Sequence, residues 1–191
     1  MTVDRVIGHQ EWLWMRAKEE ELSAKELAEL EELRDLMLQR KLSMSGRTLW
    51  LGGTEVSKKR EASQFNCSFL KIETVQDTVD TLWLLLPGCG VGFTPVVGTL
   101  NGFSNTIQDI EVLRSTRMDK GGEEENRESF EQGTWTIKVG DSAEAWAKSI
   151  GKLLAGKYNA TKLVLDFTEL RPAGQRLSGY GWISSGDEAI A

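Results

Sequence analysis

The stretch FNCSFLKIETVQDTVDTLWLLLPGCGVGF, residues 65–93, decides the fold class of this chain. Its first part is typical of a strand with Phe65, Cys67 and Phe69 on one face. A helical pattern over residues 74–86 follows and ends at a glycine-rich turn that leads into a second strand. Because a strand, a helix and a strand in this order are typical of parallel strands, we predict an α/β fold.

The residues before this stretch predict helices outside the sheet. Ser23 and Glu26 form a capping-box pattern, in which the hydroxyl and the carboxylate satisfy free amides at a helix start. An apolar stripe at helical spacing follows, and we interpret it as core packing in preference to a site for a partner helix. The stripe consists of Leu27, Leu30, Leu33 and Met37. We therefore expect a helical N-terminal region over residues 1–44, followed by a short strand-like segment from Thr48 to Leu51.

The part after the second strand is less regular. Residues 107–113 fit a short helix, whereas residues 119–132 are acidic and have little apolar surface to bury. We therefore expect an acidic, mobile insertion near residues 115–134.

The α/β pattern resumes with a second capped helix. Asp141 and Glu144 open this helix, which runs to about Leu154. Residues 162–167 predict a buried strand, and the glycine- and serine-rich tail predicts a loop. The second expected region is therefore an α/β domain over residues 45–191.

Composition excludes several classes of protein. The 191 residues are 40% hydrophobic and 27% charged, which is typical of a globular chain of one ordinary domain or a small domain with an appendage. A net charge of −6 disfavours non-specific binding to nucleic acid. No apolar run reaches the roughly 18 to 20 residues of a membrane helix, and the N-terminus lacks signal-peptide character. We expect a cytoplasmic protein that binds neither nucleic acid nor membranes.

Few residues suggest chemistry by themselves. Cys67 and Cys89 are too few for a disulfide framework, and with one histidine, His9, they make no zinc site. A disulfide between them stays possible, although an inert buried thiol is the ordinary interpretation of each. The Gly88–Phe93 turn has the wrong spacing for a dinucleotide fingerprint, but its glycines would let backbone amides approach a phosphate. We assign no metal site.

Five segments in order resemble the N-terminal half of a ribonucleotide reductase of the monomeric, adenosylcobalamin-dependent (class II) kind that acts on ribonucleoside triphosphates. The resemblance covers residues 41–186. The segments are Ser45–Trp50, Asn66-Cys67 with Phe69, Gly90–Phe93, Val139–Ser142 with Trp146, and Lys162–Asp166 continuing through Leu170-Arg171-Pro172 to Ser185-Gly186. The fold that the resemblance implies is the first half of a ten-stranded α/β barrel preceded by an α-helical N-terminal region.

The resemblance also implies a reaction. In this family a thiyl radical on another cysteine abstracts the ribose 3′ hydrogen, the 2′ hydroxyl leaves as water, and a cysteine pair supplies two electrons. Cys67 matches one member of that pair, and Thr48, Asn66 and Gly90 match substrate-binding positions. The loop through which an effector nucleotide selects the base to be reduced matches Arg176, Ser178, Gly179, Gly181, Ser185 and Gly186.

The residues that this chemistry requires elsewhere are missing from the 191 residues. We therefore expect a split or truncated reductase that needs a complementary C-terminal chain, with adenosylcobalamin and a thioredoxin-like reductant serving the complete enzyme. The first alternative is a non-catalytic nucleotide-binding remnant of the same fold. The second is an unrelated α/β interaction domain whose acidic helix binds a protein partner. Substituting Cys67 tests the first alternative, because a reductase should lose turnover and keep its nucleotide binding. Deleting residues 1–40 tests the second, because an interaction domain should then lose its activity.

Overall fold

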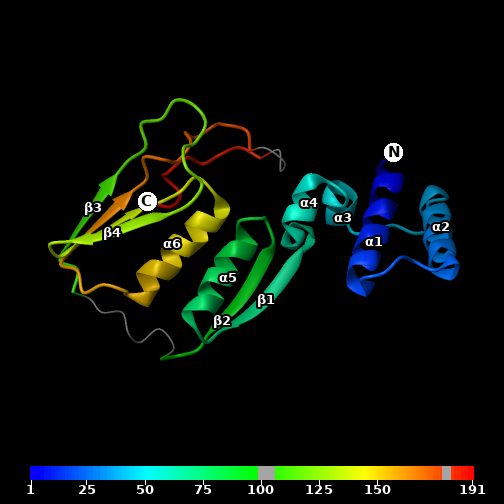
Figure 1. Cartoon of the computed structure of the whole chain (residues 1–191), viewed down its shortest axis with the longest axis horizontal. Coiled ribbons are helices and arrows are strands. Elements are labelled where there is room, and N and C mark those ends of the chain that lie inside the picture. The colour runs from blue at the N-terminus through cyan, green and yellow to red at the C-terminus, as the bar shows by residue number, and fades with distance from the viewer. Residues whose placement is uncertain (99–105, 178–181) are drawn as a thin grey trace. The chain divides into compact units, whose positions relative to one another are not determined.

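The structure, a computed structural model, describes residues 1–98, 106–177 and 182–191 (Figure 1). The chain divides into two compact units, residues 1–66 and residues 67–191. The first unit is entirely helical and the second combines helices with two sheets, so the predicted α/β class and the helical N-terminus are confirmed. No helix in the described ranges combines the length and apolar character that crossing a membrane requires.

The first unit is built on a pair of helices with a common apolar core. Its elements are α1 (Thr2–Lys18), α2 (Ala24–Leu38), α3 (Gly46–Leu51), α4 (Glu55–Lys59) and the 3-10 helix η1 (Glu61–Gln64). Ser23 and Glu26 form the expected capping box at the start of α2. Of the predicted stripe, Leu30 and Met37 are buried in the core with Val6 and Ile7, whereas Leu27 is exposed.

The short strand expected at Thr48–Leu51 is wrong, because these residues lie in helix α3. The Ser45 hydroxyl accepts a hydrogen bond from the amide of Thr48 and so caps the helix. Arg5 of α1 donates to the carbonyl oxygens of Leu49 and Gly52 at the other end. This segment therefore belongs to the helical unit, and the compact units divide at residue 66 instead of the expected residue 44.

The second unit begins with the strand, helix and strand that the sequence predicts. They are β1 (Cys67–Ile72), α5 (Val75–Leu85) and β2 (Gly90–Pro95). Strands β1 and β2 are parallel, with Cys67 opposite Gly90 and Ile72 opposite Pro95. Thr74 and Asp77 form a capping box that fixes the start of α5. Helix α5 packs on one face of this two-stranded sheet.

A four-stranded sheet in the order β3-β6-β5-β4 makes up the rest of the second unit. Its elements are β3 (Asp109–Leu113), β4 (Arg127–Glu131), β5 (Thr134–Lys138), α6 (Ala143–Ala155) and β6 (Lys162–Asp166). Strand β6 is parallel to both of its neighbours, whereas β4 and β5 are antiparallel. The core under this sheet contains Trp135, Ile137, Leu163 and Phe167, and α6 packs beside α5 (Figure 1).

Two predictions between residues 104 and 134 are corrected by the structure. The segment expected as a short helix at 107–113 contains strand β3, because pairing with β6 satisfies its backbone. The acidic segment expected as a loop at 119–132 contains strand β4. Gln132 and Gly133, with φ angles of 48° and 77°, form the two-residue turn from β4 to β5, which is the backbone that such hairpins require.

Candidate functional site

The two-stranded sheet has one open face, which carries the candidate thiol. Side chains alternate along a strand, so register partners point to the same side of the sheet. On the side away from α5 lie six exposed residues, which we call the open face. They are Cys67, Phe69 and Lys71 of β1 with their register partners Gly90, Gly92 and Thr94 of β2. The thiol of Cys67 is therefore accessible from solvent beside two residues without side chains.

The second cysteine faces the other way. Cys89 precedes Gly90 by one position and is 3% exposed, with its Sγ donating weakly to the carbonyl oxygen of Gly90 at 3.6 Å. Cys67 is exposed, and neither cysteine is in a disulfide. The interpretation of Cys89 as a small buried residue is confirmed, whereas the ordinary interpretation of Cys67 as a buried thiol is wrong.

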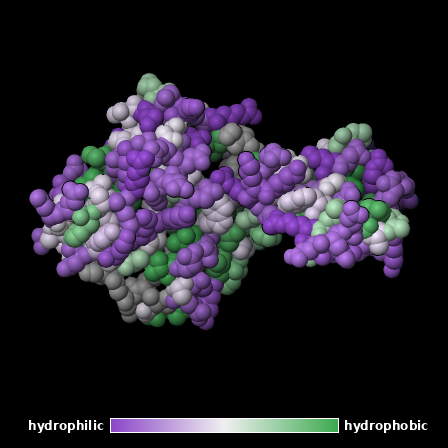
Figure 2. All heavy atoms as spheres, in the orientation of Figure 1, coloured by the Kyte–Doolittle hydropathy of each residue, from purple (hydrophilic) through white to green (hydrophobic). Residues whose placement is uncertain are grey.

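Gly92 gives the open face its shape. A Cβ atom at this position would lie 3.1 Å from Cδ2 of Phe69, because the Phe69 ring lies across the strand beside it. Phe69 is 68% exposed. Figure 2 shows hydrophobic atoms at the surface over α5 and the neighbouring strands. A thiol, two glycines and an aromatic ring are therefore presented together on an accessible sheet face.

The remaining predicted substrate residues lie in the first unit. Thr48 is half-buried in α3, with its Oγ1 3.0 Å from the Oγ of Ser45. Asn66 is exposed at the last position before β1. The structure thus brings Cys67 and Gly90 together, and Asn66 adjoins Cys67 along the chain.

The predicted specificity loop is described in part. Ser178, Gly179 and Gly181 lie outside the described residues, whereas Arg176, Ser185 and Gly186 lie within them. Arg176 is exposed and bridges Ile183 in an antiparallel pair. Gly186 is buried and has a φ angle of +72°, which favours glycine at this position.

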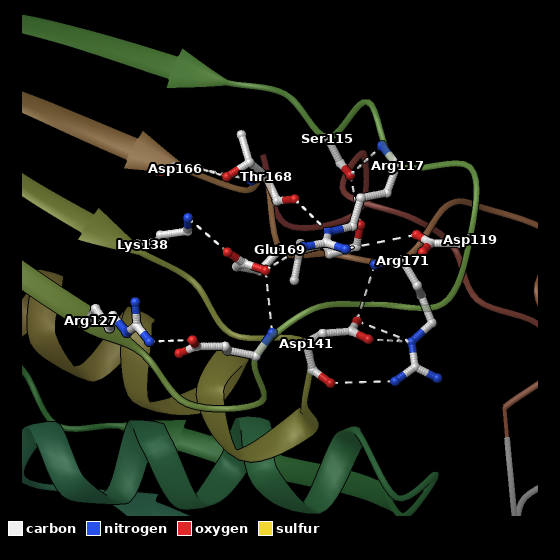
Figure 3. A network of polar contacts seen from close by, with 12 residues as sticks. Ser115, Arg117, Asp119, Arg127, Lys138, Asp141, Asp166, Thr168, Glu169 and Arg171 are labelled. Atoms are coloured by element: carbon white, nitrogen blue, oxygen red, sulfur yellow. Dashed lines mark hydrogen bonds and ion pairs between the residues drawn. The ribbon is translucent and has the colours of Figure 1, made fainter.

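A polar network that the sequence did not predict surrounds the ends of β5 and β6 (Figure 3). The Arg171 Nε atom donates to both carboxylate oxygens of Asp141, at 3.0 and 2.8 Å, and its backbone amide donates to the same group at 3.2 Å. Asp141 is 7% exposed. A buried carboxylate that keeps its charge needs such partners, and the pair fixes the chain where the tail leaves the core.

Glu169 forms the second centre of this network. Lys138 Nζ and Arg117 Nη2 each lie 2.7 Å from its carboxylate, and the backbone amide of Glu123 donates to it at 3.3 Å. The hydrogen bond from Lys138 is the largest cause that lowers the pKa of Glu169 from 4.5 to about 2. Spacing in the sequence does not reveal this cluster, because its members come from three separate segments.

The described residues contain no cluster of side chains that could ligate a metal ion. No group of three or more histidine, cysteine, aspartate or glutamate side chains in the described ranges could hold a metal ion. The single imidazole, that of His9, is 2% exposed, and its Nε2 lies 2.9 Å from Gln64 Nε2. The burial of His9 and its hydrogen bond fit the structural role that the sequence indicated.

Comparison with known proteins identifies relatives of a single kind. No protein-family model matches the chain. The adenosylcobalamin-dependent ribonucleoside-triphosphate reductase of Lactobacillus helveticus is 25% identical over 198 residues, which cover 83% of this chain and 26% of the relative. The enzyme of the same name from Lacticaseibacillus paracasei is 28% identical over 182 residues, covering 74% and 24%.

A solved structure supports the same fold. The crystal structure of a B12-dependent (class II) ribonucleotide reductase superposes with a TM-score of 0.76 at 21% sequence identity. The match covers 99% of this chain and 32% of that one. This chain therefore spans about a quarter of the length of the curated relatives that it matches.

Proposed function

We propose that this chain, which is related to the adenosylcobalamin-dependent ribonucleoside-triphosphate reductases, supplies one redox thiol for the reduction of ribonucleotides to 2′-deoxyribonucleotides. The observation that carries the proposal is the exposed Cys67 on the open face, opposite Gly90. In this proposal the parallel strands β1 and β2 belong to the first half of a ten-stranded α/β barrel, and the open face lines its interior.

The proposed reaction assigns one electron and one proton to Cys67. The substrate loses its C2′–OH bond and gains a C2′–H bond, with the oxygen leaving as water. Two thiols become a disulfide and supply the two electrons and two protons that this change consumes. A thiyl radical on a third cysteine removes the 3′ hydrogen at the start and recovers it at the end. A thioredoxin-like dithiol then reduces the disulfide.

The second thiol of the pair comes from outside these 191 residues. Cys89 is buried on the opposite side of the sheet from Cys67, so the two side chains do not face each other. The partner cysteine and the radical cysteine therefore belong to the remaining C-terminal part of the reductase, on the same polypeptide or on a complementary chain. The exposed ring of Phe69 fits burial against that part.

Substrate binding is assigned by resemblance and by chemistry. Gly90 lies beside Cys67 and has no side chain to keep a ribose from the thiol. Thr48 and Asn66 would donate hydrogen bonds to the nucleotide. The loop that contains Arg176, Ser185 and Gly186 would respond to an effector nucleotide and select the base, together with Ser178, Gly179 and Gly181.

The cellular compartment of the enzyme follows from its thiol chemistry. A dithiol that must be returned to the reduced state in each cycle works in a reducing compartment, and we propose the cytoplasm. Adenosylcobalamin, on which the relatives depend by name, would serve the complete enzyme.

Substituting each cysteine tests the proposal. Cys67→Ser should lower nucleotide reduction by the enzyme reconstituted with its C-terminal part by ~1,000-fold or more, because serine cannot form the disulfide. Nucleotide affinity, measured by calorimetry, should change less than about twofold, since the hydroxyl occupies nearly the same volume. Cys89→Ala is the matched control and should retain turnover.

Two outcomes would contradict the proposal. Full turnover by the Cys67→Ser variant would remove the redox role of this thiol. A reconstituted wild-type protein that binds nucleotides and reduces none would favour the non-catalytic remnant instead.

A further inference from the structure

The tail of the second unit forms a paired arm. Residues 171–177 lead away from the core and residues 182–187 return to it, and we call these two segments the arm. The amides of Gly174 and Leu177 donate to the carbonyl oxygens of Ser184 and Trp182, at 2.9 and 2.6 Å. The amide of Ser184 donates to Gln175 at 2.7 Å. The arm is therefore a two-stranded projection whose orientation depends on how its two ends are fixed.

A buried carboxylate fixes the outgoing end. Asp141 accepts the Arg171 Nε at 2.8 Å and the Arg171 amide at 3.2 Å, and its own carbonyl oxygen accepts the Arg171 Nη2 at 3.3 Å (Figure 3). Six atoms, three from Asp141 and three from Arg171, thus define both the position and the direction of the chain.

A second carboxylate fixes the returning end. Asp187 accepts the Arg114 Nε at 2.7 Å, the Arg114 Nη2 at 3.3 Å and the Ser115 amide at 2.9 Å. Its side chain is 13% exposed, and the hydrogen bond from Arg114 is the main cause that lowers the pKa of its carboxyl group. This aspartate is therefore charged at neutral pH and held on both oxygens.

One segment between β3 and β4 contacts both fixed ends of the arm. Residues 114–123, which we call the strap, contain Arg114 and Ser115, and the Ser115 hydroxyl also donates to the carbonyl oxygen of Leu170 at 2.6 Å. At the other end of the strap, the Glu123 carbonyl oxygen accepts the Asp141 amide at 2.7 Å. The strap thus touches the arm at its outgoing and its returning base.

We propose that Asp141, on the connection from β5 to α6, and Arg114, on the strap, are positioning residues that fix the two ends of the arm and thereby determine which nucleotide base the reductase accepts. The selectivity part rests on the proposed function, in which the arm belongs to the specificity loop. The anchoring part stands on the contacts alone. A base-selecting loop can discriminate only if its backbone has a defined position, and the two carboxylate–guanidinium pairs provide one.

Hydrogen exchange of the full chain tests the anchoring. Asp187→Asn and Asp141→Asn each remove a charge and keep the side-chain shape, so the amides of Gly174, Leu177 and Ser184 should exchange about tenfold faster or more. The double variant Arg114→Asp with Asp187→Arg restores an ion pair in reverse and should recover most of the protection. The control is Glu111→Gln on β3, three residues before Arg114, which removes the charge of the 2.7 Å pair with Lys162 and should leave the arm unchanged.

Base preference of the reconstituted reductase tests the selectivity. With one effector present, Asp187→Asn should change the ratio of kcat/KM values for two competing ribonucleotides by about threefold or more, and the charge-reversed pair should restore the ratio. A merely structural role would lower turnover for both substrates equally and leave their ratio constant.

Each experimental outcome tests a separate part of the proposal. Unchanged exchange in both aspartate variants overturns the anchoring. Faster exchange with an unchanged substrate ratio overturns the selectivity. A wild-type enzyme that reduces no nucleotide overturns the proposed function and the selectivity with it, while the exchange data still decide the anchoring.

Discussion

At the scale of single residues, the position of Cys67 on its sheet determines what the thiol can do. The alternating pattern predicts that Cys67 and Phe69 share a face, and the structure confirms this. The pattern does not reveal which face α5 covers, because that depends on the packing of a whole helix. The exposure of the candidate thiol is therefore a property of the tertiary structure and could not be read from the residues around it.

His9 provides a prediction about pH at the same scale. Burial is the largest cause that lowers the pKa of His9 below 6.5, and the hydrogen bond with Gln64 opposes it. The neutral ring is favoured in the folded state, so its contribution to stability is present above pH 6.5 and is lost as the pH falls through the folded pKa. Each unit of pKa depression corresponds to about 1.4 kcal/mol.

Urea denaturation between pH 7.5 and pH 5.5 checks this prediction. The first unit should lose stability over that range in the wild type, whereas the His9→Gln variant should show a flatter profile. An equal slope in both proteins would assign the pH dependence to other groups.

At the scale of elements, helices with capping residues were predictable and edge strands were not. The helices α2, α5 and α6 begin beside Ser23, Thr74 and Ser142, whose side chains accept hydrogen bonds from free amides. The sequence predicts the cap at Ser23, whereas the cap of α6 is Ser142 and not the expected Asp141. Strand β3 pairs with β6, which lies about fifty residues later in the sequence. A local pattern carries no information about such a partner, and this is why the 107–113 segment was expected to be helical.

The contact between α5 and α6 yields a prediction with a matched control. Gly151 of α6 is buried, and a Cβ atom there would overlap the side chain of Val79 on α5. Gly151→Ala should therefore lower the free energy of unfolding by about 1–3 kcal/mol, although alanine favours helix by roughly 1 kcal/mol. Thermal or urea denaturation measures the change.

Two further variants separate packing from helix propensity. Val79→Ala combined with Gly151→Ala should be less destabilised than the sum of the single variants, because the overlap is removed. Gly8→Ala in α1 has open space around its Cβ position and should raise stability by up to about 1 kcal/mol. Destabilisation by Gly8→Ala of the size found for Gly151→Ala would contradict the packing argument.

At the scale of the whole molecule, the described residues form two separate apolar cores. One contains Val6, Leu30 and Met37 and belongs to the helical unit, and the other contains Trp135 and Ile137 and belongs to the α/β unit. The sequence predicted both a helical and an α/β region. The predicted boundary lies at residue 44, whereas the compact units divide at residue 66. The hydrogen bond from Arg5 to Leu49 joins α3 to the helical unit, and a local pattern does not reveal a contact between such distant residues.

Truncating one residue in each core tests their independence. Ile137→Ala and Met37→Ala should each destabilise their own unit by about 2–5 kcal/mol, because each leaves a cavity in a packed core. Hydrogen exchange resolved along the chain should accelerate within residues 67–191 for the first variant and within residues 1–66 for the second. Equal acceleration in both units by either variant would mean that the chain unfolds as one cooperative body.

The contacts of Asp141 have a consequence for substitutions in this region. A Cβ atom at Gly121 would overlap the Asp141 carboxylate, and the same carboxylate holds Arg171. A side chain at position 121 is therefore tolerated only with a smaller residue at 141, which in turn leaves the guanidinium at 171 without its counter-charge. The effects of substitutions at these three positions should therefore be non-additive.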